Sequence, residues 1–273
     1  LVANEREHLV LELDDGGYRI VSVAAVEKRT PKDGPEPATA NEILARLEKR
    51  YGKTHFRGYK QDPFVLGLVL AEPLPKTAEA RATGALKQSA GFYKAVEAEL
   101  GKFAKEFQIP VRAPSHPLVV LIFETDELFE KYAHEVTQGQ MLASTTIMGV
   151  YSGITNVLAV RMSECFTFEV PLHEAIHQQV MNRHMFQRLA PIPHWFQEGI
   201  ATGFEGTKGR ISQGPAKVTA RYARQALAAQ KLTWEQVLTD DRVFNGDVLV
   251  GEAYGYGWSI HWLLLTKYRA QYG

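Results

Sequence analysis

Hydrophobic residues recur every three or four positions over one long stretch of the chain, and this spacing predicts a long helix. We expect the helix to start at Thr77, a residue type that favours the N-cap, and to continue to Phe107. The apolar positions are Leu86, Ala90, Tyr93, Val96, Leu100, Phe103 and Phe107. Because they share one helix face, we interpret them as core packing rather than as a ligand site.

The first part of the chain alternates polar and apolar residues over shorter distances. Residues 9 to 26 predict a β-hairpin closed by an Asp-Asp-Gly-Gly turn. A loop rich in proline and glycine follows, and residues 41 to 51 have the spacing of a short helix. We therefore expect residues 1–52 to form a small N-terminal region of unknown role, with the main domain at residues 53–273.

The middle of the chain alternates apolar runs with helical spacing. Four runs predict strands, and the residues at 126 to 133 predict a short helix. The strands are expected at residues 64 to 70, 118 to 123, 147 to 151 and 156 to 162. Such an order indicates an α+β fold in which a sheet is backed by helices.

Composition and charge narrow the function classes. With 45% hydrophobic residues, the 273-residue chain can bury a sizeable core. Lys plus Arg and Asp plus Glu number 31 each, so no chain-wide field favours nucleic acid or an anionic membrane. No apolar run approaches the roughly 20 residues of a transmembrane helix. We therefore expect a soluble protein with no nucleic-acid partner and no transmembrane segment.

A single cysteine, Cys165, excludes an internal disulfide framework and a multi-cysteine zinc site. We interpret it as a small buried hydrophobic residue. The chain begins at Leu1 with neither a methionine nor a basic and apolar leader, which leaves open whether a signal peptide has been removed. We expect a secreted, periplasmic or cell-envelope location, and the oligomeric state is left open.

The candidate chemistry lies in the sequence His173-Glu174-Ala175-Ile176-His177. Histidines at positions i and i+4 share one helix face, so both imidazoles can reach one metal ion, and a glutamate beside the first can meet a metal-activated water. Pro171 suits the first turn of such a helix, and Leu172, Ile176 and Val180 predict its buried face. The pattern indicates a zinc peptidase.

A catalytic zinc site needs a third protein ligand, and two histidines with one glutamate form an established set. Glu198 lies 21 residues after His177, within His-Trp-Phe-Gln-Glu-Gly-Ile-Ala-Thr at residues 194 to 202. Pro191 and Pro193 precede this stretch and predict a new helix. A carboxylate among large apolar residues needs a partner when buried, and we expect one zinc ion per chain to be that partner.

The two motifs together resemble the gluzincin metallopeptidases, and specifically a bacterial peptidase-MA-like family of unknown function. The resemblance covers residues 77 to 270 and rests on His-Glu-x-x-His followed by Trp-Phe-x-Glu-Gly-x-Ala. It implies a zincin-like domain, with a small mixed sheet on helices, an active-site helix and a helical C-terminal part. It also implies His173, His177 and Glu198 as zinc ligands and Glu174 as general base for peptide-bond hydrolysis.

Further roles follow from the same resemblance. The strand at Asn156 to Val160 is expected to be the sheet edge that holds an extended peptide. Many gluzincins place an acid four residues after the ligand glutamate to orient a histidine; this chain has Thr202 there, which leaves Glu205 as the alternative. Tyr254, four residues before Trp258, is favoured over Tyr256 as donor to the oxyanion. We expect the glycines at 255 and 257 to turn the chain so that this phenol faces the cleft.

The other histidines are weaker candidates. His261 is expected to be a structural histidine within a C-terminal helix, and His184 and His194 are close in sequence to the zinc motif without a ligand spacing. A rival hypothesis retains the scaffold without catalysis, as a peptidase-like binding or cell-envelope structural module. The presence of Glu174 favours the enzyme, because a binding module has no need for a general base.

Overall fold

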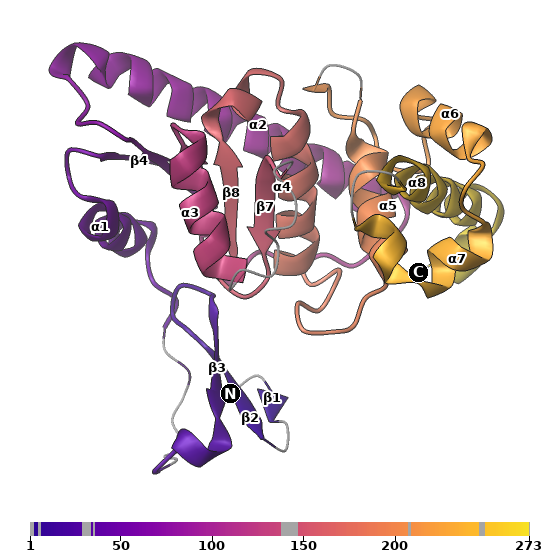
Figure 1. Cartoon of the computed structure of the whole chain (residues 1–273), viewed down its shortest axis with the longest axis horizontal. Helices are drawn as coiled ribbons and strands as arrows, with labels where there is room; N and C mark the ends of the chain where they lie inside the picture. The colour runs from indigo at the N-terminus through magenta and orange to yellow at the C-terminus, as the bar shows by residue number, and fades with distance from the viewer. Residues whose placement is uncertain are drawn as a thin grey trace. The chain divides into compact units, whose positions relative to one another are not determined.

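The computed structural model of the chain describes residues 3–4, 7–28, 34, 36–137, 147–206, 209–245 and 249–272. The fold is α+β, as predicted (Figure 1). It comprises two compact units: Leu1–Ala90 with Ala113–Leu142 and Val150–Met162, and Gly91–Arg112 with Ala143–Gly149 and Ser163–Gly273. The expected boundary after residue 52 falls inside the first unit and stays a prediction. Among the described residues, no helix has both the length and the apolar character needed to span a membrane.

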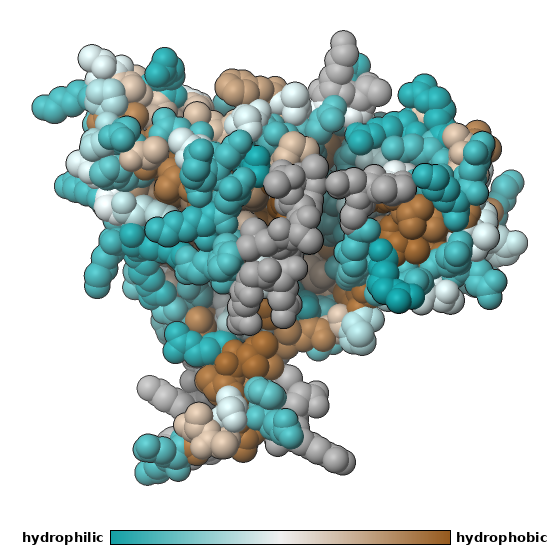
Figure 2. All heavy atoms as spheres, in the orientation of Figure 1, coloured by the Kyte–Doolittle hydropathy of each residue, from teal (hydrophilic) through white to brown (hydrophobic). Residues whose placement is uncertain are grey.

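The predicted N-terminal hairpin is confirmed. Strands β2 (His8–Glu12) and β3 (Tyr18–Ser22) pair antiparallel, and the short β1 (Ala3–Asn4) joins β2. The second strand is shorter than predicted, because Ser22 caps a 3-10 helix at Val23–Ala25. Figure 2 shows hydrophobic residues gathered at the surface over this hairpin.

The predicted helix after the proline-rich loop is α1 (Ala40–Tyr51). Thr39 and Glu42 form a reciprocal capping box at its start, in which each side chain accepts a hydrogen bond from the other residue's backbone N–H. Gly52, with a φ of 90°, ends the helix. Both helix boundaries are therefore set by local sequence.

A mixed five-stranded sheet lies at the centre of the first unit, in the order β4-β5-β6-β8-β7. The strands are β4 (Phe56–Gln61), β5 (Phe64–Val69), β6 (Leu118–Phe123), β7 (Gly149–Ser152) and β8 (Val157–Arg161). β5, β6 and β8 run parallel, whereas β4 pairs antiparallel with β5. Sequence analysis missed β4, since its exposed and half-buried polar residues break the apolar pattern. Helix α1 packs against β4 and β5, and α3 (Asp126–Thr137), longer than predicted, packs against β6 and β8.

The expected sheet edge at Asn156 to Val160 is wrong. β8 lies between β6 and β7, so β7 is the edge strand on this side of the sheet. Leu158, Ala159 and Val160 are fully buried. Such a continuous buried run is typical of an inner strand covered on both faces, whereas an edge strand has one unpaired side.

The long predicted helix is α2 (Glu79–Glu106), which begins in the first unit and continues in the second. Its start is later than predicted, because Thr77 lies in a 3-10 helix at Lys76–Ala78 and does not cap α2. All its predicted apolar positions from Leu86 to Phe103 are buried. The periodicity therefore identified the buried face correctly and missed both helix ends, since Phe107 lies just beyond α2 and is half-buried.

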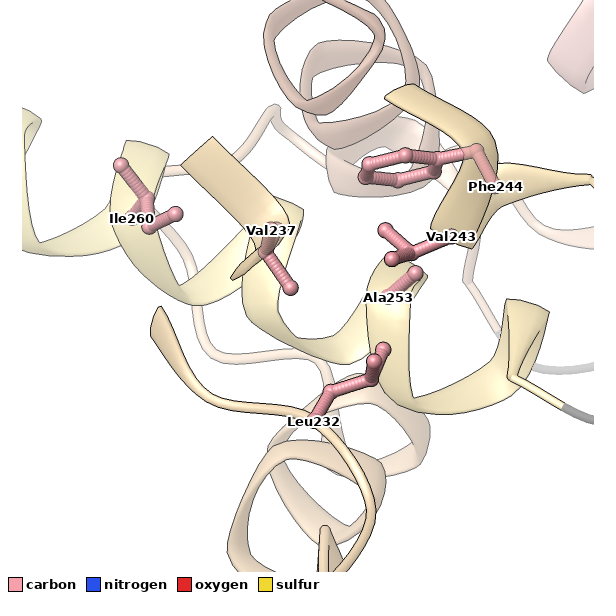
Figure 3. Packing of buried hydrophobic residues seen from close by; sticks show 6 residues of the cluster. All are labelled: Leu232, Val237, Val243, Phe244, Ala253 and Ile260. Carbon is pink, nitrogen blue, oxygen red and sulfur yellow. The ribbon is translucent and has the colours of Figure 1, made fainter. Parts of the chain in front are cut away.

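The rest of the second unit is helical. Its helices are α4 (Glu169–Asn182), α5 (His194–Phe204), α6 (Ala220–Ala228), α7 (Trp234–Thr239), α8 (Val250–Lys267) and α9 (Arg269–Tyr272), with 3-10 helices at Met162–Phe166 and Asp241–Phe244. α8 packs against α5, α6 and α7, and α5 also packs against α4. Figure 3 shows one part of this core, formed by Leu232, Val237, Val243, Phe244, Ala253 and Ile260. Tyr254 packs against this cluster, which fixes the start of α8.

Candidate metal centre

Helix α4 carries the His-Glu-x-x-His motif, as predicted. Pro171 lies in its first turn, and Leu172, Ile176 and Val180 are fully buried. Phe168 precedes the helix with a φ of 58° and stacks on Phe92 with ring centroids 4.3 Å apart. The two histidines lie one turn apart on a common side of α4, and burial of the apolar face fixes the direction of that side.

The two imidazoles and the predicted third ligand converge. The Nε2 atoms of His173 and His177 lie 3.0 Å apart, and Glu198 Oε2 lies 2.9 Å from Nε2 of His173. The other oxygen of Glu198 is 3.5 Å from Nε2 of His177. Within the described ranges, this is the one group of three or more His, Cys, Asp or Glu residues that could hold a metal ion, with its ligand atoms within 4.8 Å of one another.

Helix α5 brings Glu198 to this point. It begins after Pro193, so Glu198 lies in its second turn. The next residue, Gly199, lies against α8. A Cβ atom on Gly199 would be 2.4 Å from the carbonyl oxygen of Gly257. The absence of that atom allows the backbones of α5 and α8 to approach closely, and this approach sets the position of the adjacent Glu198.

The electrostatics of the group are those of a tightly coupled set of opposite charges. Burial acts to lower the pKa of His173, but the hydrogen bonds and charges of Glu198 and Glu205 outweigh it and raise the pKa well above its usual value. Burial acts to raise the pKa of Glu198, and the two histidines outweigh it and lower that pKa strongly.

Two imidazole nitrogens and a carboxylate oxygen are the donor set of many catalytic zinc sites, so the residues fit zinc.

Glu205 supports His173 from outside the three-residue group. Its Oε1 lies 2.7 Å from Nδ1 of His173, on the ring side opposite Glu198. Thr202, which occupies the position where many gluzincins have the acid, instead donates hydrogen bonds to the backbone oxygens of Glu198 and Gly199 in its own helix. A carboxylate on the second imidazole nitrogen orients a metal-binding histidine, and Glu205 has that geometry.

Sequence reasoning did not find Tyr222. The hydroxyl of this buried tyrosine on α6 donates a hydrogen bond of 2.5 Å to Oε2 of Glu205. No local pattern could have found it, since Tyr222 is 17 residues from Glu205 and on another helix.

Tyr254 lies beside His173 of the candidate metal-binding group, as expected. Its ring stacks on His173 with centroids 5.8 Å apart. Burial and then the charges of Glu198 and Glu174 raise its pKa, so the phenol keeps its proton. Tyr256 instead contacts Trp234, with ring centroids 5.8 Å apart.

The expected role of the neighbouring glycines is wrong. Gly255 and Gly257 lie inside α8, so they do not make a turn. A Cβ on Gly255 would be 2.6 Å from the backbone nitrogen of Ala226, and one on Gly257 would be 3.0 Å from the backbone oxygen of Trp195. They allow α6 and α5 to pack closely on α8, and this packing orients Tyr254.

The other histidines and the cysteine considered in the sequence lie outside the candidate metal-binding group of His173, His177 and Glu198. His261 is buried and structural, as predicted: Nε2 contacts the Phe196 carbonyl oxygen at 2.8 Å, and burial lowers the pKa of the imidazole to about 4. His184 is exposed, and neither it nor His194 belongs to the metal-binding group. Cys165 is half-buried, whereas it was expected to be buried, and this partial burial raises the pKa of its thiol to about 12.

Comparison with known proteins finds a partial match, to a family without a known activity. Residues 170–272, less than half of the chain, match the family described as "Protein of unknown function (DUF1570)". The matched segment contains all three residues of the candidate metal-binding group, together with Glu205, Tyr222 and Tyr254. No curated protein matches the chain.

Proposed function

We propose that this chain is a gluzincin-type zinc metallopeptidase that hydrolyses peptide bonds in a peptide or protein substrate. The observation that carries the proposal is the convergence of His173, His177 and Glu198 on one point, with their ligand atoms within 4.8 Å of one another. These side chains would hold one zinc ion per chain. The sequence resemblance to gluzincins supports the same ligand set independently.

When bound, zinc supplies a Lewis acid that polarises the scissile carbonyl and lowers the pKa of water to about 7. Glu174 is the general base. It follows His173 directly on α4 and is not itself a ligand, and its charge acts on the nearby Tyr254 hydroxyl. Its carboxylate takes the proton of the attacking water and then delivers it to the nitrogen of the leaving amine.

Tyr254 stabilises the oxyanion that develops on the carbonyl oxygen. Its phenol is protonated, half-buried and stacked beside His173, so it can donate one hydrogen bond to a substrate oxygen at this site. Glu205 accepts the Nδ1–H of His173 and holds the imidazole in the tautomer whose Nε2 is free for a metal.

The test is the substitution Glu174→Gln, which removes the base and keeps the ligands. We expect about one zinc per chain by elemental analysis in both the wild type and the variant, and cleavage of a diverse peptide library by the wild type alone. Glu235→Gln is the control, because Glu235 is exposed on α7 and lies outside the metal-binding group. It should retain both zinc and activity.

Two outcomes would overturn the proposal in different ways. A wild-type protein that is full of zinc yet cleaves no peptide would favour the binding or cell-envelope structural module. A protein that binds no zinc after exposure to the metal would reject the metal centre itself.

A further inference from the structure

The Glu205 carboxylate joins two helices that are separate in sequence. One oxygen lies 2.7 Å from Nδ1 of His173 on α4, and the other accepts the hydroxyl of Tyr222 on α6 at 2.5 Å. Glu205 itself ends α5 as its C-cap residue. Tyr222 and Glu205 are 1% and 8% exposed, so water has little access to this row of hydrogen bonds.

We propose that Tyr222 is a positioning residue for the metal centre: it fixes Glu205, and through Glu205 the imidazole of His173. This inference rests on the proposed function, since it assumes that His173 is a metal ligand. Nothing in the His-Glu-x-x-His motif or in the Glu198 helix identifies such a residue. It follows from the hydrogen bonds of one buried carboxylate.

The reason that Glu205 needs fixing is a competing cation. The guanidinium of Arg221 lies 3.7 Å from Oε2 of Glu205, and its side chain is 53% exposed. Without the Tyr222 hydroxyl, Oε2 would lose its neutral donor and turn toward this cation and the solvent. Because both oxygens belong to one rigid carboxylate, that rotation would also take Oε1 away from His173.

A second effect of losing the hydroxyl has the opposite sign. A carboxylate with one donor fewer is more basic, and a more basic partner makes the imidazole a slightly stronger ligand. We expect the loss of orientation to dominate, because removal of such outer partners typically weakens metal binding about 10- to 100-fold. The Tyr222 hydroxyl acts one bond further out, so its loss should lie at the lower end of this range.

The experiment is a zinc titration of the full chain against a chromophoric chelator. Tyr222→Phe removes one oxygen and keeps the buried ring, and we expect it to weaken zinc binding about tenfold. Tyr272→Phe is the matched control, because the Tyr272 hydroxyl makes an equally short contact of 2.5 Å, but with His261, which lies outside the metal-binding group. It should bind zinc as the wild type does. Circular dichroism and thermal unfolding of the metal-free proteins check that both variants are folded.

A double-mutant cycle tests whether Tyr222 acts through Glu205. Glu205→Met removes both acceptor oxygens at similar side-chain volume, and Tyr222→Phe should cause no further loss of affinity in that background. A spectroscopic measurement supports the cycle: with ¹⁵N-labelled histidine in the zinc-loaded protein, the Nδ1–H resonance of His173 should shift in Tyr222→Phe and stay in place in Tyr272→Phe.

The outcomes separate this inference from the proposed function. Unchanged zinc affinity in Tyr222→Phe would overturn the positioning role while the metal centre stands. An equal loss in Tyr272→Phe, or a further tenfold loss in the Glu205→Met background, would also overturn it, since the effect would then not pass through Glu205. A wild type without zinc affinity would refute both the inference and the proposed function.

Discussion

The contact between Gly199 on α5 and Gly257 on α8 offers a direct test of how helix packing builds the metal centre. In Gly199→Ala, the new Cβ would lie 2.4 Å from the Gly257 carbonyl oxygen and 2.5 Å from Cδ2 of His261. Both distances are far below van der Waals contact. The first contact is with backbone, so no side-chain rotation can relieve it, and the two helices have to separate.

The expected change in the free energy of unfolding of Gly199→Ala is the sum of two opposing effects. Alanine in place of glycine inside a helix stabilises it by about 1 kcal/mol. Forcing an extra carbon into a packed core costs about 1–3 kcal/mol, and we expect the upper end because the obstacle is a backbone oxygen. The net prediction for Gly199→Ala is a loss of about 2 kcal/mol in the free energy of unfolding. Because Glu198 adjoins the new methyl group, zinc affinity should fall as well.

Gly101 provides the matched control on another helix. A Cβ there would meet nothing within 4 Å, so Gly101→Ala should gain the propensity term alone and stabilise the protein by about 1 kcal/mol. The assay is urea unfolding of the metal-free protein followed by circular dichroism. At a slope of about 3 kcal/mol/M, Gly199→Ala should lower the midpoint by about 0.7 M while Gly101→Ala raises it. If Gly199→Ala proves as stable as Gly101→Ala, the close packing of α5 on α8 is refuted.

Three further predictions concern single side chains. Tyr254→Phe should lower kcat about a hundred- to a thousand-fold with zinc content unchanged, whereas Tyr256→Phe should leave kcat nearly the same. A large loss of kcat in Tyr256→Phe alone would instead assign the oxyanion hydrogen bond to Tyr256. Burial lowers the pKa of His261 to about 4, below about 6.5 in the unfolded chain, so the unfolded state binds more protons between these values. The free energy of unfolding should therefore fall by about 3 kcal/mol from this residue as the pH drops from 7 to 4, and an NMR titration of His261 with a midpoint near 6.5 would contradict this reasoning. Cys165, with its pKa raised to about 12, should react with iodoacetamide at pH 8 far more slowly in the folded protein than in urea, and equal rates would show that the thiol is accessible.

Local spacing in the sequence determined the elements that carry the chemistry. The i and i+4 positions of His173 and His177 follow from the pitch of a helix, whatever surrounds it. The prolines before Glu198 set the start of α5 in the same local way, and the long apolar periodicity identified the buried face of α2. The Thr39 capping box and Gly52 likewise fix α1 from within a few residues. Each of these features depends on neighbours within one or two turns.

The tertiary structure alone decided which elements lie beside one another. The expected edge strand is the inner strand β8, because strand order depends on pairing between distant segments rather than on the apolar character of one run. The hydrogen bond from the Tyr222 hydroxyl to the Glu205 carboxylate joins residues that are 17 positions apart and on different elements. Gly255 and Gly257 are the clearest case, since the same two glycines are compatible with a turn or with a close helix crossing. Only the packing of α6 and α5 against α8 shows that they make room for neighbouring backbones and so orient Tyr254.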